Sequence, residues 1–210
     1  MAKGYFITGT DTEIGKTHAA VRLIEHWRSE GKRVMAMKPI AAGCEVLPDG
    51  RWVNDDVERL IAASGQTDRE LMNPYRFLPP VSPHIAAREA GVAISLDTIK
   101  EHYLALAEQA DLVLVEGAGG WFAPLSDTLF MRDLAWALDL PIILVVGMRL
   151  GCINHALLTA QAIEASGLPL AGWVANRVVP DQPAYEDNLA TLKAHIHAPL
   201  LLEIPFEQKS

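Results

Sequence analysis

Uninterrupted apolar runs alternate with longer amphipathic segments along this chain. Residues 112–115 and 142–146 are continuous apolar runs, which predict strands buried on both faces, as in a parallel sheet. Between such runs, apolar residues recur at helical spacing, as at Leu96, Ile99 and Tyr103. This alternation predicts an α/β fold with a mostly parallel sheet and helices on both faces. The predicted strands are residues 5–7, 33–37, 112–116, 141–146, 171–176 and 199–205.

Turn-forming residues separate the predicted elements. Residues 40–52 are predicted to form a loop because they contain Gly43, Pro48 and Gly50. Residues 73–84 are rich in proline and are predicted to be irregular. Gly147 is predicted to end the strand that begins at residue 141. The predicted helices are residues 19–24, a run from 54 to 61, a short helix after His84, residues 95–110, a helix that begins within 150–155, and one through Leu189 and Leu192.

The segment from Gly9 to Thr17 has the sequence GTDTEIGKT and lies between a predicted strand and a predicted helix. This order is typical of a phosphate-binding P-loop, in which backbone N–H groups and the helix dipole attract phosphate. Five residues separate Gly9 from Gly15, one more than in the usual pattern, so the loop is a longer variant. We expect Lys16 to reach the β- and γ-phosphates and the Thr17 hydroxyl to bind Mg²⁺. The alternative is an ordinary turn between a strand and a helix.

Two further candidate groups lie at the carboxyl ends of predicted strands, where open α/β sheets bind ligands. Lys38 ends the second strand before Pro39, and its alternative interpretation is a solvated surface lysine. Glu116 ends a buried strand and precedes a Gly-Ala-Gly-Gly segment. It is therefore a candidate Mg²⁺ ligand, followed by backbone N–H groups that can face a phosphate. A chance acidic residue at a strand end is the alternative for Glu116.

The remaining polar candidates have two interpretations each. Asn54, Asp55 and Asp56 open a predicted helix, and an Asn or Asp here is either the helix N-cap or, for an aspartate, a metal carboxylate. The helix after Gly151 either binds a substrate carboxylate at its N-terminus or is simply capped there. Cys152 is expected to be a packing residue rather than a nucleophile, because no activating partner is evident. The amide of Asn176, at a strand end, is a candidate contact for a nucleotide base.

Composition narrows the functional class. The chain of 210 residues is 50% hydrophobic, which fits a single domain, residues 1–210, with a large core. Its formal net charge of -8 argues against general nucleic-acid binding. It has two cysteines, and we expect neither a signal peptide nor a membrane span. We therefore expect a soluble protein of the reducing cytoplasm, without nucleic-acid or membrane partners.

Together, these motifs resemble the dethiobiotin synthetase family over nearly the whole chain. The longer P-loop is that family's signature, and the matching segments are residues 9–17, 38–39, 73–75, 82–85, 115–121, 150–155 and 172–176. The resemblance implies a three-layer P-loop NTPase fold and an ATP- and Mg²⁺-dependent cyclo-ligase of biotin biosynthesis that forms a homodimer. Its substrates would be ATP, 7,8-diaminopelargonic acid (7,8-diaminononanoate) and CO₂. The ureido ring of dethiobiotin would form through a carbamate and a carbamic-phosphoric anhydride, with release of ADP and phosphate.

The resemblance also implies roles for individual residues. Lys38 would hold and polarise the carbamate, and Lys16 and Thr12 would act near the phosphates. Mg²⁺ would be bound by Thr17, Asp55 and Glu116, because an ungapped alignment between Lys38 and Asn73 favours Asp55 over Asp56. The implied nucleotide-binding residues are Glu13, Ile14, Gly15, Lys16, Thr17, His18, Asp55, Glu116, Gly117, Ala118, Gly119, Asn176, Arg177, Pro205, Phe206 and Glu207. The implied substrate-binding residues are Lys38, Ala42, Gly151, Cys152, Ile153 and Asn154, of which the last four would hold the substrate carboxylate near the dimer interface.

The sequence departs from the family's pattern at positions near the ligands. Ala42 stands where the family often has a serine, and Asn188 stands where a tyrosine can bind substrate across the dimer. We also expect the end of the chain at Ser210 to leave out part of the nucleotide rim.

An alternative function is a P-loop ATPase switch of the partitioning type, although such switches carry a lysine where this chain has Asp11. A related cobyrinic acid amide synthetase is disfavoured, because we expect no glutamine-hydrolysing domain in a chain of this length.

Overall fold

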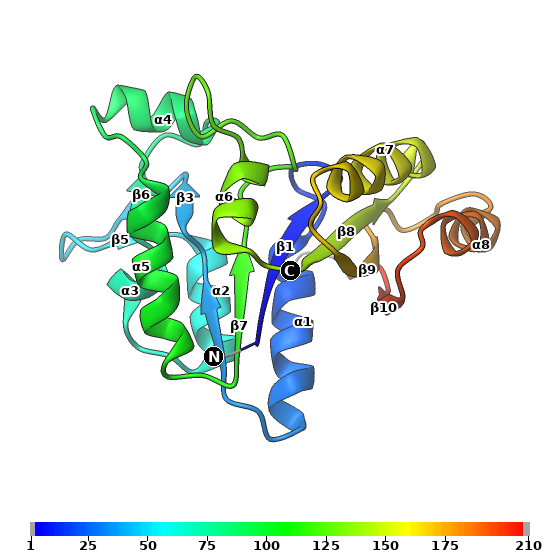
Figure 1. Ribbon diagram of the computed structural model, residues 1–210, viewed down its shortest axis with the longest axis horizontal. Coiled ribbons are helices and arrows are strands. Elements are labelled where there is room, and N and C mark those ends of the chain that lie inside the picture. The colour runs from blue at the N-terminus through cyan, green and yellow to red at the C-terminus, as the bar shows by residue number, and fades with distance from the viewer. Residues whose placement is uncertain (1–2, 208–210) are drawn as a thin grey trace.

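The protein has an α/β fold built on a parallel central sheet. A computed structural model describes residues 3–207. The sheet has 6 strands in the order β10-β9-β8-β1-β7-β2, and every neighbouring pair is parallel (Figure 1). The predicted parallel sheet is thereby confirmed. Its strands are β1 (Lys3–Gly9), β2 (Val34–Met37), β7 (Leu112–Glu116), β8 (Ile142–Met148), β9 (Leu170–Arg177) and β10 (Leu200–Ile204).

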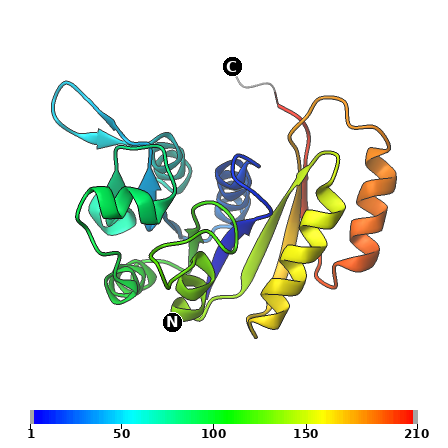
Figure 2. The same cartoon turned by 90° about the horizontal axis from the view of Figure 1, so that it is seen from above.

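Helices cover both faces of the sheet, as the alternation of elements predicts. The helices are α1 (Lys16–Ser29), α2 (Asp55–Ser64), α3 (Arg69–Met72), α4 (Pro83–Glu89), α5 (Leu96–Ala107), α6 (Met131–Leu138), α7 (Cys152–Ala165) and α8 (Tyr185–His195). Phe6 and Val113 pack with α5 to α8, whereas their neighbours Ile7 and Leu114 pack with α1 and α2 on the opposite face. Figure 2 shows α1 and α7 on opposite sides of the sheet. None of the helices within residues 3–207 is long and apolar enough to cross a membrane.

Residues 40–52 were predicted as a loop, but two short strands lie within them and a third begins at Trp52. β3 (Ile40–Ala42) pairs in parallel with β6 (Tyr75–Phe77), which lies in the segment predicted to be irregular. β4 (Glu45–Val46) and β5 (Trp52–Val53) form an antiparallel pair. Strands this short carry no readable pattern, because their stability comes from tertiary pairing. Helix α6 was also not predicted, although its buried residues Met131, Leu134 and Leu138 have helical spacing.

Strand β8 continues through Gly147, so the prediction that Gly147 ends this strand was wrong. A Cβ atom at Gly147 would lie 2.6 Å from the Cγ2 atom of Ile14. Gly147 is therefore a close-packing residue, which allows the loop after β1 to lie against the end of β8.

The strand order brings the candidate groups to one edge of the sheet. β7 lies between β1 and β2. The P-loop follows β1, Glu116 is the last residue of β7, and Lys38 directly follows β2. Because parallel strands end at the same edge, these three groups converge although they are distant in sequence.

Candidate active site

The P-loop connects β1 to α1. Gly15 caps α1 with a φ of 82°, a left-handed conformation that glycine adopts without strain. Glu13 has a φ of 59°, which is uncommon for a residue with a side chain and is found at functional loops. The Nδ2 atom of Asn176, at the end of β9, donates to the carbonyl oxygen of Ile14 at 2.8 Å. Asn176, which was predicted as a contact for the base, therefore supports the shape of the P-loop in this structure.

Lys16 is buried at the start of α1. Its Nζ atom donates to the backbone carbonyl oxygen of Asp11 at 2.9 Å, so the loop curves around the ammonium group. Burial is the main cause that lowers the pKa of Lys16 to about 8, although the nearby Glu116 carboxylate raises it. An anion placed in the loop would favour the charged form of Lys16, because opposite charges at short distance stabilise each other.

Lys38 lies between two carboxylates. Its Nζ atom is 2.7 Å from Oε1 of Glu116 and 2.6 Å from Oδ2 of Asp56. The Thr17 hydroxyl donates to the same Oε1 atom of Glu116 at 2.7 Å. These side chains come from the ends of β2 and β7 and from the first turns of α1 and α2. We call Thr17, Lys38, Asp56 and Glu116 the lysine–carboxylate cluster.

Contacts within this cluster shift the pKa values of its lysine and of Asp56. Burial would lower the pKa of Lys38, but Glu116 and Asp56 outweigh it and raise the pKa above lysine's ordinary value of 10.5. Burial would raise the pKa of Asp56, but Lys38 and Thr17 together hold it below its usual range. Lys38 is therefore an ammonium group at neutral pH, suited to hold an anion and unsuited to accept a proton.

Asp56, rather than Asp55, is the helix carboxylate of the cluster. Asn54 caps α2, its side chain accepting a hydrogen bond from the N–H group of Val57. Asp55 is exposed at the wall of the site, whereas Asp56 is half-buried and contacts Lys38. This geometry favours Asp56 over the Asp55 of the ungapped alignment as the metal carboxylate, because α2 directs the side chain of Asp56 toward Lys38.

The oxygen atoms of the cluster fit Mg²⁺. The Oε2 atom of Glu116 is buried and has no hydrogen-bond partner within residues 3–207, so it is a free acceptor beside the Thr17 hydroxyl. No group of three or more His, Cys, Asp or Glu side chains in the described chain could hold a metal alone. Mg²⁺ often takes one or two carboxylates and completes its shell with water and phosphate oxygens. Thr17, Asp56 and Glu116 are thus the residues that would hold it.

A cleft of about 1410 Å³ runs along the carboxyl edge of the sheet. The predicted site residues that line it are Thr12, Glu13, Gly15, Lys16, Thr17, His18, Lys38, Ala42, Asp55, Glu116, Ala118, Gly119, Asn176, Arg177, Pro205, Phe206 and Glu207. Ile14 and Gly117 do not line it, because Ile14 packs against Gly147 and Gly117 packs against Phe6. The cleft therefore joins the P-loop, the lysine–carboxylate cluster and residues 205–207.

Some residues of the cleft were missed from the sequence. Arg59 lies on α2 three positions after Asp56. Residues with this spacing lie on the same side of a helix, so the sequence could have indicated that Arg59 faces the cleft. Residues 80–83 also line the cleft. Local sequence indicated only that they are irregular, and their position at the cleft wall depends on tertiary packing.

Residues 205–207 lie beside α1. The Oε1 atom of Glu207 accepts a hydrogen bond from Nη2 of Arg22 at 2.7 Å, and its Oε2 atom lies 3.7 Å from Nε2 of His18. Burial is the main cause that lowers the pKa of His18. Because His18 and Arg22 both lie on α1, these contacts fix the end of the cleft to the helix that begins with Lys16.

The predicted carboxylate-binding loop does not join this cleft within one chain. Residues 151–154 start α7 after β8, and they are not among the lining residues. Gly151 and Asn154 are exposed, and the adjacent Leu150 is 93% exposed. Cys152 is buried near Gln182, whose Nε2 atom lies 3.8 Å from the sulfur. The loop therefore lies at the protein surface, with Cys152 as a packing residue.

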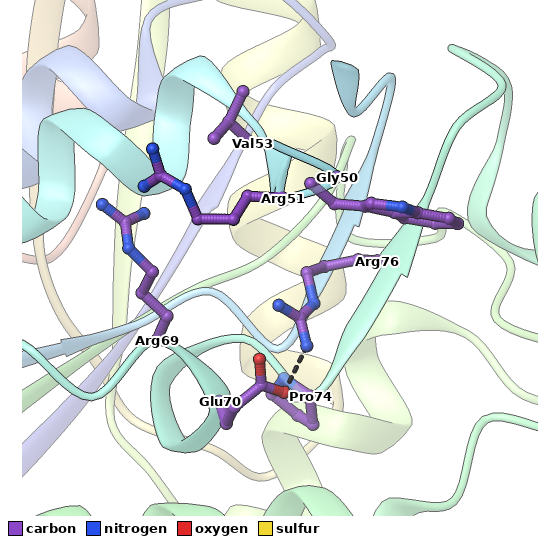
Figure 3. A pocket seen from close by; sticks show the side chains of 8 residues that line it. Gly50, Arg51, Val53, Arg69, Glu70, Pro74 and Arg76 are labelled. Carbon is purple, nitrogen blue, oxygen red and sulfur yellow. Dashed lines mark hydrogen bonds and ion pairs between the residues drawn. The ribbon is translucent and has the colours of Figure 1, made fainter. Parts of the chain in front are cut away.

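A second cavity, of about 520 Å³, lies beside β5 and β6 and contains none of the predicted site residues. Figure 3 shows the side chains of three arginines around it. Each arginine is paired with a carboxylate: Arg51 with Asp49, Arg69 with Glu58, and Arg76 with Glu70. Because the chain already neutralises these charges, the cavity has no unpaired cation that would attract a ligand.

Comparison with known proteins places this geometry in a family. A family model described as an AAA domain matches residues 3–210. The ATP-dependent dethiobiotin synthetase BioD of Nitrosospira multiformis is 50% identical over 209 residues, which cover 99% of this chain and 90% of that protein. The ATP-dependent dethiobiotin synthetase BioD 1 of Escherichia coli (strain K12) is 48% identical over 206 residues, which cover 98% of this chain and 92% of that protein.

Solved structures with lower sequence identity share the fold. The septum site-determining protein MinD of Pyrococcus horikoshii OT3, complexed with Mg-ADP, has a TM-score of 0.58 at 17% identity and is similar over 99% of this chain and 82% of its own. A ParA family ATPase of Chlorobium tepidum TLS has a TM-score of 0.58 at 16% identity, with coverage of 99% and 86%. These two likenesses establish the P-loop NTPase fold alone. On the evidence of its relatives at 48% to 50% identity over nearly its full length, the chain belongs to the ATP-dependent dethiobiotin synthetase family.

Proposed function

We propose that this protein is an ATP- and Mg²⁺-dependent cyclo-ligase that forms the ureido ring of dethiobiotin from 7,8-diaminopelargonic acid and CO₂. The observation that carries the proposal is the Lys38 ammonium group, held 2.7 Å from Glu116 in the same cleft as the P-loop. A fixed cation beside a phosphate site suits phosphoryl transfer to an anionic acceptor. The names of the relatives support the choice of substrate and the role in biotin biosynthesis.

In this proposal, the phosphates of ATP lie in the P-loop and the base lies toward β9. Backbone N–H groups around Gly15, the dipole of α1 and the Lys16 ammonium would bind the phosphates. Asn176 and residues 205–207, which line the far end of the cleft, would contact the base. Mg²⁺, held by Thr17, Asp56 and Glu116, would supply neutralisation of charge at the β- and γ-phosphates.

Lys38 would hold the acceptor of the phosphoryl group. One amine of the diamine combines with CO₂ and loses a proton to give a carbamate. The Lys38 ammonium group, which lies in the same cleft as the P-loop, would position the carbamate as an ion pair. A carbamate oxygen then forms a bond to the γ-phosphorus, and the bond between that phosphorus and the β-phosphate oxygen breaks to release ADP. Attack of the second amine on the carbonyl carbon closes the ring, with loss of phosphate and a proton.

We further propose that the active form is a homodimer in the cytoplasm. Residues 151–154 lie at the surface beside the 93% exposed Leu150, where a second copy of the chain can reach them. The N-terminus of the 14-residue helix α7 would favour the substrate carboxylate through its dipole. The Nδ2 atom of Asn188, which stands where the family resemblance implies a tyrosine, donates to the backbone oxygen of Pro183 at 3.5 Å. The net charge of -8 gives no support for a nucleic-acid partner.

The test is phosphate release from MgATP, measured with and without 7,8-diaminopelargonic acid and bicarbonate. We expect release to require both co-substrates and to fall at least about 100-fold in Lys38→Ala, the size of effect expected for loss of a charge that stabilises the transition state. Lys100→Ala, which changes an exposed lysine on α5, is the matched control and should behave as wild type. Phosphate release that is indifferent to the diamine would contradict the proposal and favour an ATPase switch of the partitioning type.

A further inference from the structure

Arg149 and Asp11 form an ion pair that joins the P-loop to the end of the neighbouring strand. Asp11 lies in the loop between β1 and α1, and Arg149 directly follows β8. The Nη2 atom of Arg149 is 2.6 Å from Oδ2 of Asp11. The other carboxylate oxygen, Oδ1, accepts a hydrogen bond from the backbone N–H group of Thr12 at 2.8 Å. Both oxygen atoms of the Asp11 side chain are therefore engaged.

The Asp11 carboxylate lies outside the cleft, although its neighbours in the loop lie inside it. Thr12 and Glu13 line the cleft, whereas Asp11 and Arg149 do not. Lys16 contacts the backbone carbonyl oxygen of Asp11 and not its carboxylate. The loop therefore keeps the Asp11 carboxylate away from the surface to which the phosphates would bind, whereas Glu13 lies at the cleft wall.

An acidic side chain in a phosphate-binding loop creates an electrostatic problem. Repulsion between like charges is strong at the few ångströms that separate residues of one loop, and it falls when a counter-ion neutralises one of them. The other contacts between the P-loop and β8 are neutral: Thr10 N–H donates to the Val145 carbonyl at 3.0 Å, and Gly147 N–H donates to the Thr10 hydroxyl at 3.4 Å. Arg149 supplies the positive charge at this contact.

We propose that Arg149 is a positioning residue of the nucleotide site, which neutralises Asp11 and holds its carboxylate outside the cleft so that the P-loop accepts the phosphates of ATP. Arg149 acts through Asp11 and does not itself contact the nucleotide. This inference rests on the proposed function only in taking ATP as the ligand of the P-loop.

The test is direct binding of MgATP and MgADP to the full-length protein by calorimetry, without diamine or bicarbonate. We expect Arg149→Gln to weaken ATP binding about tenfold, because the freed Asp11 charge repels the triphosphate. ADP, which carries less charge, should lose less affinity. Arg149→Lys keeps the positive charge and should retain most of the wild-type affinity.

The double variant Asp11→Asn/Arg149→Gln decides between mechanisms. If Arg149 acts by neutralising Asp11, removal of the aspartate charge should restore ATP affinity to within about twofold of wild type. The proposal is overturned if the double variant binds as weakly as Arg149→Gln, because Arg149 would then contact phosphate directly or maintain the loop in another way. It is also overturned if Arg149→Gln binds ATP like wild type.

Arg33→Gln is the matched control for loss of one positive charge. Arg33 pairs with Asp111 at the opposite edge of the sheet, before β2 and β7, so its removal should leave ATP affinity unchanged. A kinetic measurement adds a second distinction. Arg149→Gln should raise the KM for ATP, whereas a general disturbance of the adjacent residues 151–154 would raise the KM for the diamine.

Failure of the proposed function has a different signature. In that case wild-type phosphate release would be independent of diamine and bicarbonate, while the binding series for the Arg149 variants could still be measured and interpreted.

Discussion

The ammonium nitrogen of Lys38 lies 2.7 Å from Oε1 of Glu116, although the two residues are 78 positions apart in the chain. They meet because β2 and β7 are neighbouring parallel strands that end at the same edge. The Lys38 side chain is 6% exposed and that of Glu116 is 1% exposed, so the pair is almost completely removed from water. Removal of Lys38 therefore leaves the buried Glu116 carboxylate without this counter-ion.

Lys38→Met should destabilise the nucleotide-free protein. We expect a loss of about 3 kcal/mol in the free energy of unfolding, because the Glu116 carboxylate stays buried and loses its main cationic partner. The double variant Lys38→Met/Glu116→Gln should recover most of this stability while remaining inactive. Urea denaturation of the three proteins measures the effect. Equal stability of the single and double variants would show that the buried charge is not the cause.

Lys16→Met should abolish ATP binding and stabilise the nucleotide-free protein. The pKa of Lys16 falls from 10.5 to about 8 in the folded state, so folding disfavours its charged form. This shift corresponds to a cost to folding on the order of 3 kcal/mol. The stability gained by Lys16→Met should be smaller than this cost, because the variant also loses the hydrogen bond to the Asp11 carbonyl oxygen. The gain should be largest below pH 8, where the lysine is charged in both states, and should shrink as the pH rises toward 10.5, where it becomes neutral in both.

The Lys16→Met prediction can be checked by urea denaturation at pH 7 and at pH 9.5 to 10. Lys100→Met, at an exposed position, is the control for a general effect of removing a lysine. A stability difference that does not change with pH would rule out burial of the Lys16 charge as its source.

Asp56→Asn should weaken Mg²⁺-dependent turnover far more than Asp55→Asn does. Asp56 lies 2.6 Å from Lys38, whereas the neighbouring Asp55 is exposed. We expect Asp56→Asn to raise the Mg²⁺ concentration for half-maximal activity at least about tenfold, because a neutral amide is a poorer ligand than a carboxylate for a hard cation. Asp55→Asn is the matched control, and its Mg²⁺ concentration for half-maximal activity should stay within about twofold of the wild-type value. A larger rise in the Mg²⁺ requirement for Asp55→Asn than for Asp56→Asn would instead identify Asp55 as the metal carboxylate.

Ala42→Ser should strengthen binding of the diamine substrate. Ala42 lines the cleft, and the family resemblance places a substrate-binding serine at this position. One neutral hydrogen bond contributes about 0.5–1.5 kcal/mol, so the KM for the diamine should fall about two- to tenfold. The KM for ATP should not change. A variant with an unchanged KM for the diamine would show that the substrate does not reach this wall of the cleft.

The sequence was most informative where an uninterrupted apolar run ended in a polar residue. Such runs predicted β7 and the position of Glu116, and the P-loop motif predicted the start of α1 and the place of Lys16. These features depend on local composition and on the edge at which parallel strands end. The roles of these residues in catalysis remain proposals, but their convergence in one cleft follows directly from the predicted topology.

What the sequence could not predict depends on contacts between distant segments. The choice between Asp55 and Asp56 depends on the rotation of α2 about its axis, which the packing of Val57 and Leu60 in the core determines. β3 exists because Ile40 pairs with Tyr75, and neither segment shows a strand pattern alone. Gly147 was interpreted as a strand end, but a glycine is required there by close contact with Ile14, a residue distant in the sequence.

The contact between Glu207 and Arg22 has a consequence for the order in which the protein is made. The two residues are 185 positions apart, so one wall of the cleft forms only after almost the whole described chain has left the ribosome. The P-loop is synthesised early, whereas Glu116 and then residues 205–207, which line the same cleft, are synthesised much later. Contacts of such long sequence separation form late and slowly during folding. A chain that has not yet reached residue 207 therefore lacks this wall of the cleft.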